Sequence, residues 1–184
     1  MGDRRRELLA GARGRVLEIG AGTGANLPHY GPLEELTLAE PDPAMRRRLA
    51  RKLETHPAPV RVLAAPAESV PVPDASADTV VVTIALCSVA DQARALAEAR
   101  RALVPGGRLL FLEHVRGEGR RGRWQDRADP LWSRLFAGCH PNRDTLAAIR
   151  EAGFELEEVV TRDDGPAPAL VRPVVIGIAR APSP

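Results

Sequence analysis

Apolar runs rich in β-branched residues recur along the chain, and more polar stretches separate them. The runs cover residues 15–19, 35–39, 60–63, 79–84, 107–113, 154–160 and 173–179. Strands that are continuously apolar are typical of parallel sheets covered on both faces, because neither side of such a strand meets water. The pattern therefore predicts seven strands in a mostly parallel sheet.

Several of the intervening stretches have the spacing and the start signals of helices. Asp42-Pro43 opens residues 42–55 as an N-cap followed by a first-turn proline. Residues 91–103 carry apolar side chains at helical spacing behind Asp91 as a cap. A third helix is expected to begin at Asn142 and to stop at Ala152-Gly153. Strand–helix alternation of this kind predicts an α/β, Rossmann-like doubly wound fold.

The last two apolar runs follow each other without a helix between them. The linking segment 161–172 contains Asp163-Asp164-Gly165-Pro166, which is typical of a turn. Two strands joined in this way pair antiparallel, so we expect an antiparallel C-terminal strand. The sequence contains no internal repeat and no low-complexity linker, and we therefore expect residues 1–184 to form a single domain.

The composition of the chain argues against several classes of protein, among them nucleic-acid-binding, membrane-spanning and disulfide-rich proteins. The net charge is only +2, with 44% hydrophobic and 27% charged residues, so bulk charge gives no reason to expect a nucleic-acid partner. No run approaches the roughly 18 apolar residues of a membrane span or forms a signal peptide. Cys87 and Cys139 are far apart in the sequence and form no CxxC, which suggests neither a disulfide framework nor a zinc site. A reducing, cytoplasmic compartment is the expectation.

The segment from Val16 to Asn26 carries the clearest chemical signal in the chain. An apolar strand runs into Glu18 and then into glycines at alternate positions, Gly20, Gly22 and Gly24, with a helix-compatible segment behind them. Glycine is needed where the backbone turns tightly and approaches a ligand without a Cβ in the way. A helix N-terminus after such a turn adds free N–H groups. The segment therefore predicts a nucleotide-like ligand.

Two interpretations fit this glycine loop. Gly20-x-Gly22-x-x-Ala25 satisfies the dinucleotide fingerprint, with Glu40 twenty residues after Gly20 to bind a ribose. The same residues also satisfy Glu18-x-Gly20-x-Gly22-x-Gly24, a form seen in S-adenosylmethionine-dependent methyltransferases. Both cofactors carry an adenosine ribose, so both need a carboxylate after the second strand. The loop alone leaves a nicotinamide-dependent oxidoreductase open.

Further motifs favour the methyltransferase. Ala67-Glu68 follows the third strand, residues 70–78 lead into the fourth, and Pro105-Gly106-Gly107 precedes the fifth. In this order they resemble class I methyltransferases from residue 15 to the C-terminus. A narrower resemblance rests on residues 83–89, Glu113-His114-Val115, Trp124-Gln125, Asp129-Pro130-x-Trp132, Gly138-Cys139 and Ala152-Gly153-Phe154. These motifs are similar to the methyltransferase-like protein seven group, whose characterised members are thiol S-methyltransferases.

The resemblance implies a role for each matching position around S-adenosyl-L-methionine. Backbone of the glycine loop approaches the methionine and ribose parts, and Glu18 holds the loop or binds the cofactor's ammonium. Glu40 takes the ribose hydroxyls. The adenine lies against the residues after the second and third strands, and the methionine side is lined by residues past the fourth. The implied cofactor-binding set is Glu18, Gly20, Ala21, Gly22, Glu40, Pro41, Ala67, Glu68, Thr83 and Leu86.

The acceptor side is expected beyond the fifth strand, where His114 stands. An imidazole there can take a proton from a thiol or hydroxyl, and a structural histidine bonded to backbone is the alternative. No metal is required for this chemistry, and the four histidines show no ligand spacing. Trp124, Trp132 and Phe136 are expected to cover the substrate, or to fasten an extra helix to the sheet. The function expected is methyl transfer to a small, apolar acceptor, with a thiol favoured. A non-catalytic, cofactor-binding regulator remains a further alternative.

Overall fold

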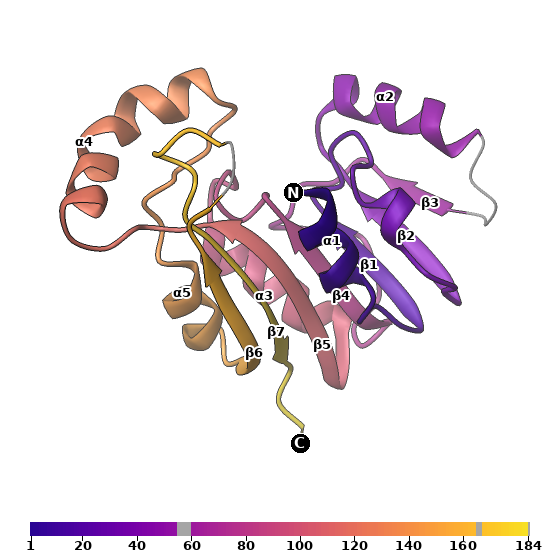
Figure 1. Ribbon diagram of the computed structural model, residues 1–184. Helices are drawn as coiled ribbons and strands as arrows, with labels where there is room; N and C mark the ends of the chain where they lie inside the picture. Colours follow the sequence, from indigo (N-terminus) through magenta and orange to yellow (C-terminus); the bar gives the residue numbers. More distant parts are fainter. Residues whose placement is uncertain (55–59, 165–166, 184) are drawn as a thin grey trace.

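The computed structural model describes residues 1–54, 60–164 and 167–183, and a seven-stranded sheet runs through them (Figure 1). The strand order is β3-β2-β1-β4-β5-β7-β6. Strands β1 to β5 pair in parallel, and β7 runs antiparallel to both of its neighbours. The strands are β1 (Arg15–Ile19), β2 (Glu35–Ala39), β3 (Val60–Leu63), β4 (Ala77–Thr83), β5 (Leu103–His114), β6 (Glu155–Arg162) and β7 (Val174–Arg180).

Helices cover both faces of the sheet and bury two separate apolar layers. The first layer holds α3 (Gln92–Ala102) and α5 (Thr145–Glu151), whose Leu96 and Ile149 are fully buried. The second holds α1 (Gly2–Leu9) and α2 (Pro43–Leu53), through Leu9 and Leu49. This two-sided cover explains why the central strands are apolar on both faces. Among the described residues, no helix combines the length and the apolar character that crossing a bilayer demands.

The order of the strands fixes where a ligand can bind. From β1 the chain moves outward to β2 and β3, and it then returns to place β4 on the other side of β1. The connection after β1 runs toward one edge of the sheet, and the connection after β4 runs toward the other edge. The loops at the carboxyl ends of β1 and β4 therefore separate from each other. In open α/β sheets this reversal marks the ligand crevice. Figure 1 shows α2 and α4 (Gly119–Leu135) beside this upper edge, over opposite halves of the sheet.

The predicted fold class is confirmed, including the antiparallel C-terminal strand. Several bounds differ. Strand β5 begins at Leu103 rather than 107, because Leu103 already pairs with Ala77 ahead of a register shift. Helix α5 begins at Thr145, three residues after the expected Asn142, because the Asp144 side chain accepts from the Ala147 N–H and caps the helix there. Thr55, the last residue of the predicted helical segment 42–55, lies outside the described residues.

Helix α1 was not predicted, and α4 was expected only as the alternative in which Trp124, Trp132 and Phe136 fasten an extra helix to the sheet. Helix α4 contains Gly119, Gly122 and Pro130, residues of poor helix propensity, and its segment therefore carried no helical signal. Helix α1 is largely charged, and only Leu8 and Leu9 are buried from it. Tertiary contacts hold both helices, which is the usual reason that short or glycine-rich helices escape prediction from local sequence.

Candidate active site

The glycine loop at the end of β1 adopts the left-handed backbone that its glycines permit. Gly20 has φ 72°, and a Cβ there would lie 2.5 Å from the Cβ of Ala85 in the loop after β4. Gly22 has φ 56°, yet a Cβ there would meet no atom within 4 Å. Gly20 therefore allows two loops to pack together, whereas Gly22 presents bare backbone to an open space. That space is a cradle that a ligand can enter.

The N–H groups of Gly20, Ala21 and Gly22 in this loop are paired within the protein. Gly20 and Ala21 both donate to the carbonyl of Ala39, and Gly22 donates to the Glu40 carboxylate at 2.8 Å. The expected helix behind the loop is absent from the described segment, which forms only the three-residue 3₁₀ turn η1 (Leu27–His29). A pyrophosphate needs unpaired N–H groups at a helix N-terminus. The loop geometry therefore suits a cofactor without phosphate, which counts against the dinucleotide interpretation.

Glu40 connects the ends of β1 and β2. One carboxylate oxygen accepts from the Gly22 N–H and the other from the Asp42 N–H, each at 2.8 Å. The side chain is buried to 7% exposure. An ionised carboxylate has about four lone-pair positions, so two remain after these bonds. Glu40 can thus hold the loop and still accept from a pair of ligand hydroxyls.

Glu18 is buried at the centre of a hydrogen-bond network. Asn26 Nδ2 donates to one of its oxygens at 3.0 Å, and the Tyr30 hydroxyl donates to the other at 2.7 Å. Burial raises the pKa of Glu18 to about 7, and the bonds from Tyr30 and Asn26 oppose that rise. A carboxyl group with this pKa changes charge near neutrality. A cation placed beside it would favour the carboxylate.

Arg5 of α1 also reaches into this network, a contact that no pattern along the chain predicted. Its guanidinium donates to Asn26 Oδ1 at 2.5 Å and to Thr83 Oγ1 at 2.6 Å. Thr83, an expected site residue at the end of β4, also accepts from Asn26 at 3.0 Å. The first helix thus closes over the carboxyl ends of β1 and β4. It brings a fixed positive charge to the expected methionine side of the site.

The other expected cofactor residues are distributed around the same edge of the sheet. Pro41 is exposed after Glu40, whereas Ala67 is buried. Glu68 is half-buried, and its carboxylate accepts from the Asp91 N–H ahead of α3 at 3.1 Å. Leu86 is only 1% exposed and lies in the loop that follows Thr83 and the end of β4.

Glu113 positions the loop after β4, a role that its place in a sequence motif did not reveal. One carboxylate oxygen accepts from the N–H groups of Ala85 and Leu86, and the other from that of Cys87. The side chain is fully buried, and burial raises its pKa against the opposing effect of the three donors. A buried carboxylate of this kind fixes backbone that would otherwise have unpaired N–H groups.

His114, Cys87 and Cys139 lie together at the carboxyl ends of β4 and β5. The two sulfurs are 3.8 Å apart, and His114 Nδ1 is 3.6 Å from Cys139 Sγ and 3.8 Å from Cys87 Sγ. The Cys87 side chain is fully buried. Sequence spacing suggested no relation among these three residues, because 52 positions separate the cysteines. The fold alone brings them together.

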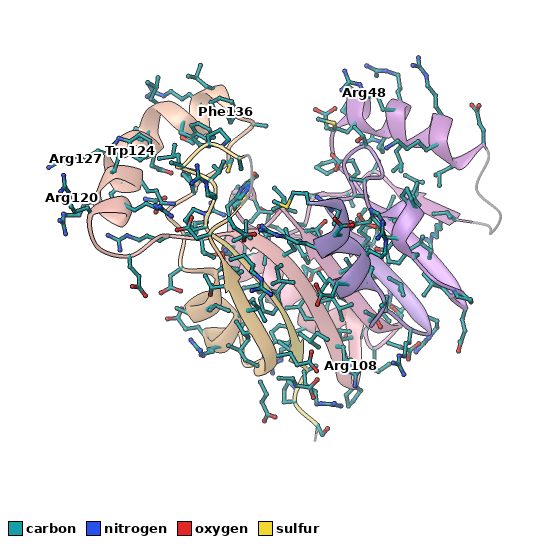
Figure 2. All side chains as sticks on the ribbon, in the orientation of Figure 1. Arg48, Arg108, Arg120, Trp124, Arg127 and Phe136 are labelled. Atoms are coloured by element: carbon teal, nitrogen blue, oxygen red, sulfur yellow. The ribbon has the colours of Figure 1, made fainter. Side chains whose placement is uncertain are left out.

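Helix α4 is attached to this region by one buried side chain. Gln125 accepts from the Gly117 N–H and donates to the carbonyls of Val115, Pro141 and Leu170. The Trp132 and Phe136 rings stack with centroids 3.9 Å apart. Trp124 is half exposed, and Figure 2 shows Arg120 and Arg127 of the same helix pointing away from the sheet.

A sheet of this order, with a glycine loop whose N–H groups are paired within the protein, a buried carboxylate on β1 and another after β2, is typical of an S-adenosylmethionine-dependent methyltransferase. Comparison with known proteins agrees. The Methyltransferase domain family matches residues 17–111, and the chain belongs to that family. It uses S-adenosyl-L-methionine as its cofactor, and the open space at Gly22 beside Glu40 fits such a group.

Individual relatives narrow the comparison. The human thiol S-methyltransferase TMT1A is 36% identical over 97% of this chain and 79% of its own length. The human thiol S-methyltransferase TMT1B is 37% identical over 79% of the chain, which spans only 63% of that protein. A SAM-dependent methyltransferase of Thermotoga maritima superposes with a TM-score of 0.74 at 25% identity, over 98% of this chain and 88% of that one.

Proposed function

We propose that this methyltransferase transfers the methyl group to a small, apolar thiol. The observation that carries the proposal is the 36% identity to human thiol S-methyltransferase TMT1A over 97% of the chain. A thiol also suits the site chemically, because a few per cent of an ordinary thiol is already thiolate at neutral pH and is strongly nucleophilic. The enzyme then has mainly to hold the nucleophile in line with the methyl carbon.

The contacts at the carboxyl edge of the sheet support the cofactor-binding roles that we propose for its residues. When bound, S-adenosyl-L-methionine supplies an electrophilic methyl group. Gly22 presents bare backbone to it, Gly20 and Ala21 shape the same loop, and the free lone pairs of Glu40 accept from its ribose hydroxyls. Glu18 stabilises its ammonium group, and Arg5 offers a guanidinium to its carboxylate.

The remaining residues shape the two ends of the cofactor site. Pro41 and Ala67 supply apolar surface for the adenine. Glu68 lies at the adenine edge, although its carboxylate also accepts from Asp91. Thr83 and Leu86 line the methionine side.

His114 is proposed as the catalytic residue on the acceptor side, where it assists removal of the acceptor's proton. It stands at the end of β5, two strands from the glycine loop, which corresponds to about 10 Å across a sheet. That separation leaves room for a methyl group and an acceptor atom between them. Helix α4, with Trp132 and Phe136 stacked, covers the acceptor side.

We also propose that residues 1–184 act as one domain, and two free thiols support a reducing compartment such as the cytoplasm.

A transfer assay with methyl-labelled cofactor tests the proposal. Pairs of acceptors matched in ring and size, differing only in a thiol or a phenol group, separate acceptor chemistry from shape. We expect label in the thiol products, with the matched phenols methylated far more slowly. Transfer to phenols and not to thiols would overturn the thiol assignment. Cofactor binding without transfer to any acceptor of the panel would favour a regulatory protein instead.

A further inference from the structure

The cluster of Cys87, His114 and Cys139 is arranged like the ligands of a metal ion. The three donor atoms all lie within 4.8 Å of one another, with separations of 3.8, 3.6 and 3.8 Å. Two tetrahedral zinc–sulfur bonds of about 2.3 Å place their sulfurs about 3.8 Å apart, and a zinc–nitrogen bond of about 2.0 Å places the nitrogen about 3.5 Å from each sulfur. The observed triangle therefore has the dimensions of one face of a zinc tetrahedron.

The backbone around the cluster holds these side chains in place before any ion arrives. Glu113 accepts from the Cys87 N–H at 3.1 Å, and the Cys87 carbonyl accepts from the His140 N–H at 2.7 Å. The second bond joins the loop after β4 directly to the residue after Cys139. A rigid ligand set lowers the cost of ordering the site when a metal binds.

The surroundings also suit a zinc–dithiolate centre. The cluster packs against Ile84, Trp132, Ala167 and Val171, which supply a largely apolar shell. One Zn²⁺, two thiolates and a neutral imidazole sum to no net charge, which such a shell tolerates. Trp132 packs against the cluster, and its indole N–H is buried without a hydrogen-bond partner among the described residues. An N–H donor beside a ligand sulfur is a common outer contact of metal sites.

We propose that Cys87, His114 and Cys139 bind one Zn²⁺ ion, and that its fourth coordination position is open to the sulfur of the acceptor. Among the described residues, no further histidine, cysteine or carboxylate joins the three. Three protein ligands with one open position are the arrangement of catalytic rather than structural zinc sites. The second half of the proposal rests on the proposed thiol substrate.

The open position gives the ion a chemical task. A thiol that coordinates zinc loses its proton, which passes to solvent, and its sulfur is then held as a thiolate. No oxidant or reductant takes part. His114 assists deprotonation in this arrangement through the metal that it holds. The cluster lies beyond the carboxyl ends of β4 and β5, one and two strands from β1, so the bound sulfur would lie at the same edge of the sheet as the cradle at Gly22.

Metal content is the first test. The full chain is produced without a polyhistidine tag in zinc-supplemented medium and dialysed against metal-free buffer, and its metals are measured by mass spectrometry. We expect about one zinc per chain in the wild type and in the control variant His29→Gln, which removes a histidine on η1. Cys87→Ser, Cys139→Ser and His114→Ala should lose the metal, with folding checked by circular dichroism. Equal metal content in all variants would overturn the proposal.

Two measurements on the wild type avoid any folding defect of the variants. The chain has only two cysteines, so zinc should protect both thiols from a thiol reagent until a chelator is added. Cobalt substitution should give the intense visible bands of a tetrahedral site together with sulfur-to-cobalt charge transfer. Addition of a small thiol, without the cofactor, should shift those bands. Unprotected thiols, or a Cys87–Cys139 disulfide with no bound metal, would refute the site.

Trp132→Phe provides a sharper variant, because it removes the orphaned N–H and keeps an aromatic ring. Loss of an outer contact to a metal ligand lowers metal affinity by about 10-fold or more. Unchanged zinc affinity would remove Trp132 from the argument for this site.

The outcomes of these tests separate the proposed zinc site from the proposed thiol substrate. A metal-free enzyme that methylates thiols overturns the zinc site alone, and a zinc protein that methylates no thiol overturns the proposed substrate.

Discussion

Replacement of Glu18 by glutamine tests how the buried network responds to pH. Glutamine keeps the shape of the side chain, and its carbonyl oxygen can still accept from Asn26, while the Tyr30 hydroxyl can reverse and accept from the new amide. The variant therefore removes the ionisation of Glu18 and little else. Any difference in pH dependence between the two proteins then belongs to this one group.

The size of the effect follows from the pKa of Glu18, which rises from 4.5 to about 7 on folding. Below about pH 4.5 the group is protonated in both states. Between the two pKa values the unfolded state loses its proton first, so the stability of the folded protein falls as pH rises. Each pKa unit corresponds to about 1.4 kcal/mol, and the loss therefore approaches 3 kcal/mol by about pH 8. Above that pH no further loss is expected from this group.

Urea unfolding of the cofactor-free proteins between about pH 4.5 and 8 measures this difference. The free energy of unfolding of the wild type, minus that of Glu18→Gln, should fall by about 3 kcal/mol across the range. Glu113 also has a raised pKa, but it is present in both proteins and cancels. A constant difference across the range would refute the assignment of a neutral, buried Glu18 to the free enzyme.

Three further predictions concern the cofactor cradle. Gly20→Ala should lower the free energy of unfolding by about 2–5 kcal/mol, because its Cβ meets Ala85 in a left-handed backbone. Gly22→Ala should lower it by only about 1–2 kcal/mol yet abolish cofactor binding. Thermal melts and calorimetric titration measure the two effects, and normal cofactor binding by Gly22→Ala would contradict the cradle. Glu40→Ala should weaken cofactor affinity by about 1–3 kcal/mol in the same titration, and unchanged affinity would remove Glu40 from the ribose. Cofactor binding near neutral pH should release a proton, because the cofactor's ammonium group lowers the pKa of Glu18. Calorimetric titrations in buffers of different ionisation enthalpy should therefore give different binding heats. Equal heats would contradict the contact between Glu18 and the ammonium group.

The sequence predicted the elements that are governed by local chemistry. Apolar runs predicted the strands because a strand buried on both faces has no polar positions. Aspartates predicted the starts of α2 and α3, where Asp42 and Asp91 accept from first-turn N–H groups. Local signals failed for α4, because its glycines and proline lower helix propensity, whereas the contacts that hold it, such as those of Gln125 with three carbonyls, are tertiary.

By itself, the sequence determined the order of strands and helices, the glycine turn after β1 and the carboxylates at 18 and 40, because each depends on residues close together in the chain. Only the tertiary structure decided what those residues contact. Arg5 reaches Thr83 across 78 positions, and Cys139 reaches Cys87 across 52. Such neighbours arise when parallel strands bring their carboxyl ends to one edge of a sheet, and no spacing along the chain encodes that proximity.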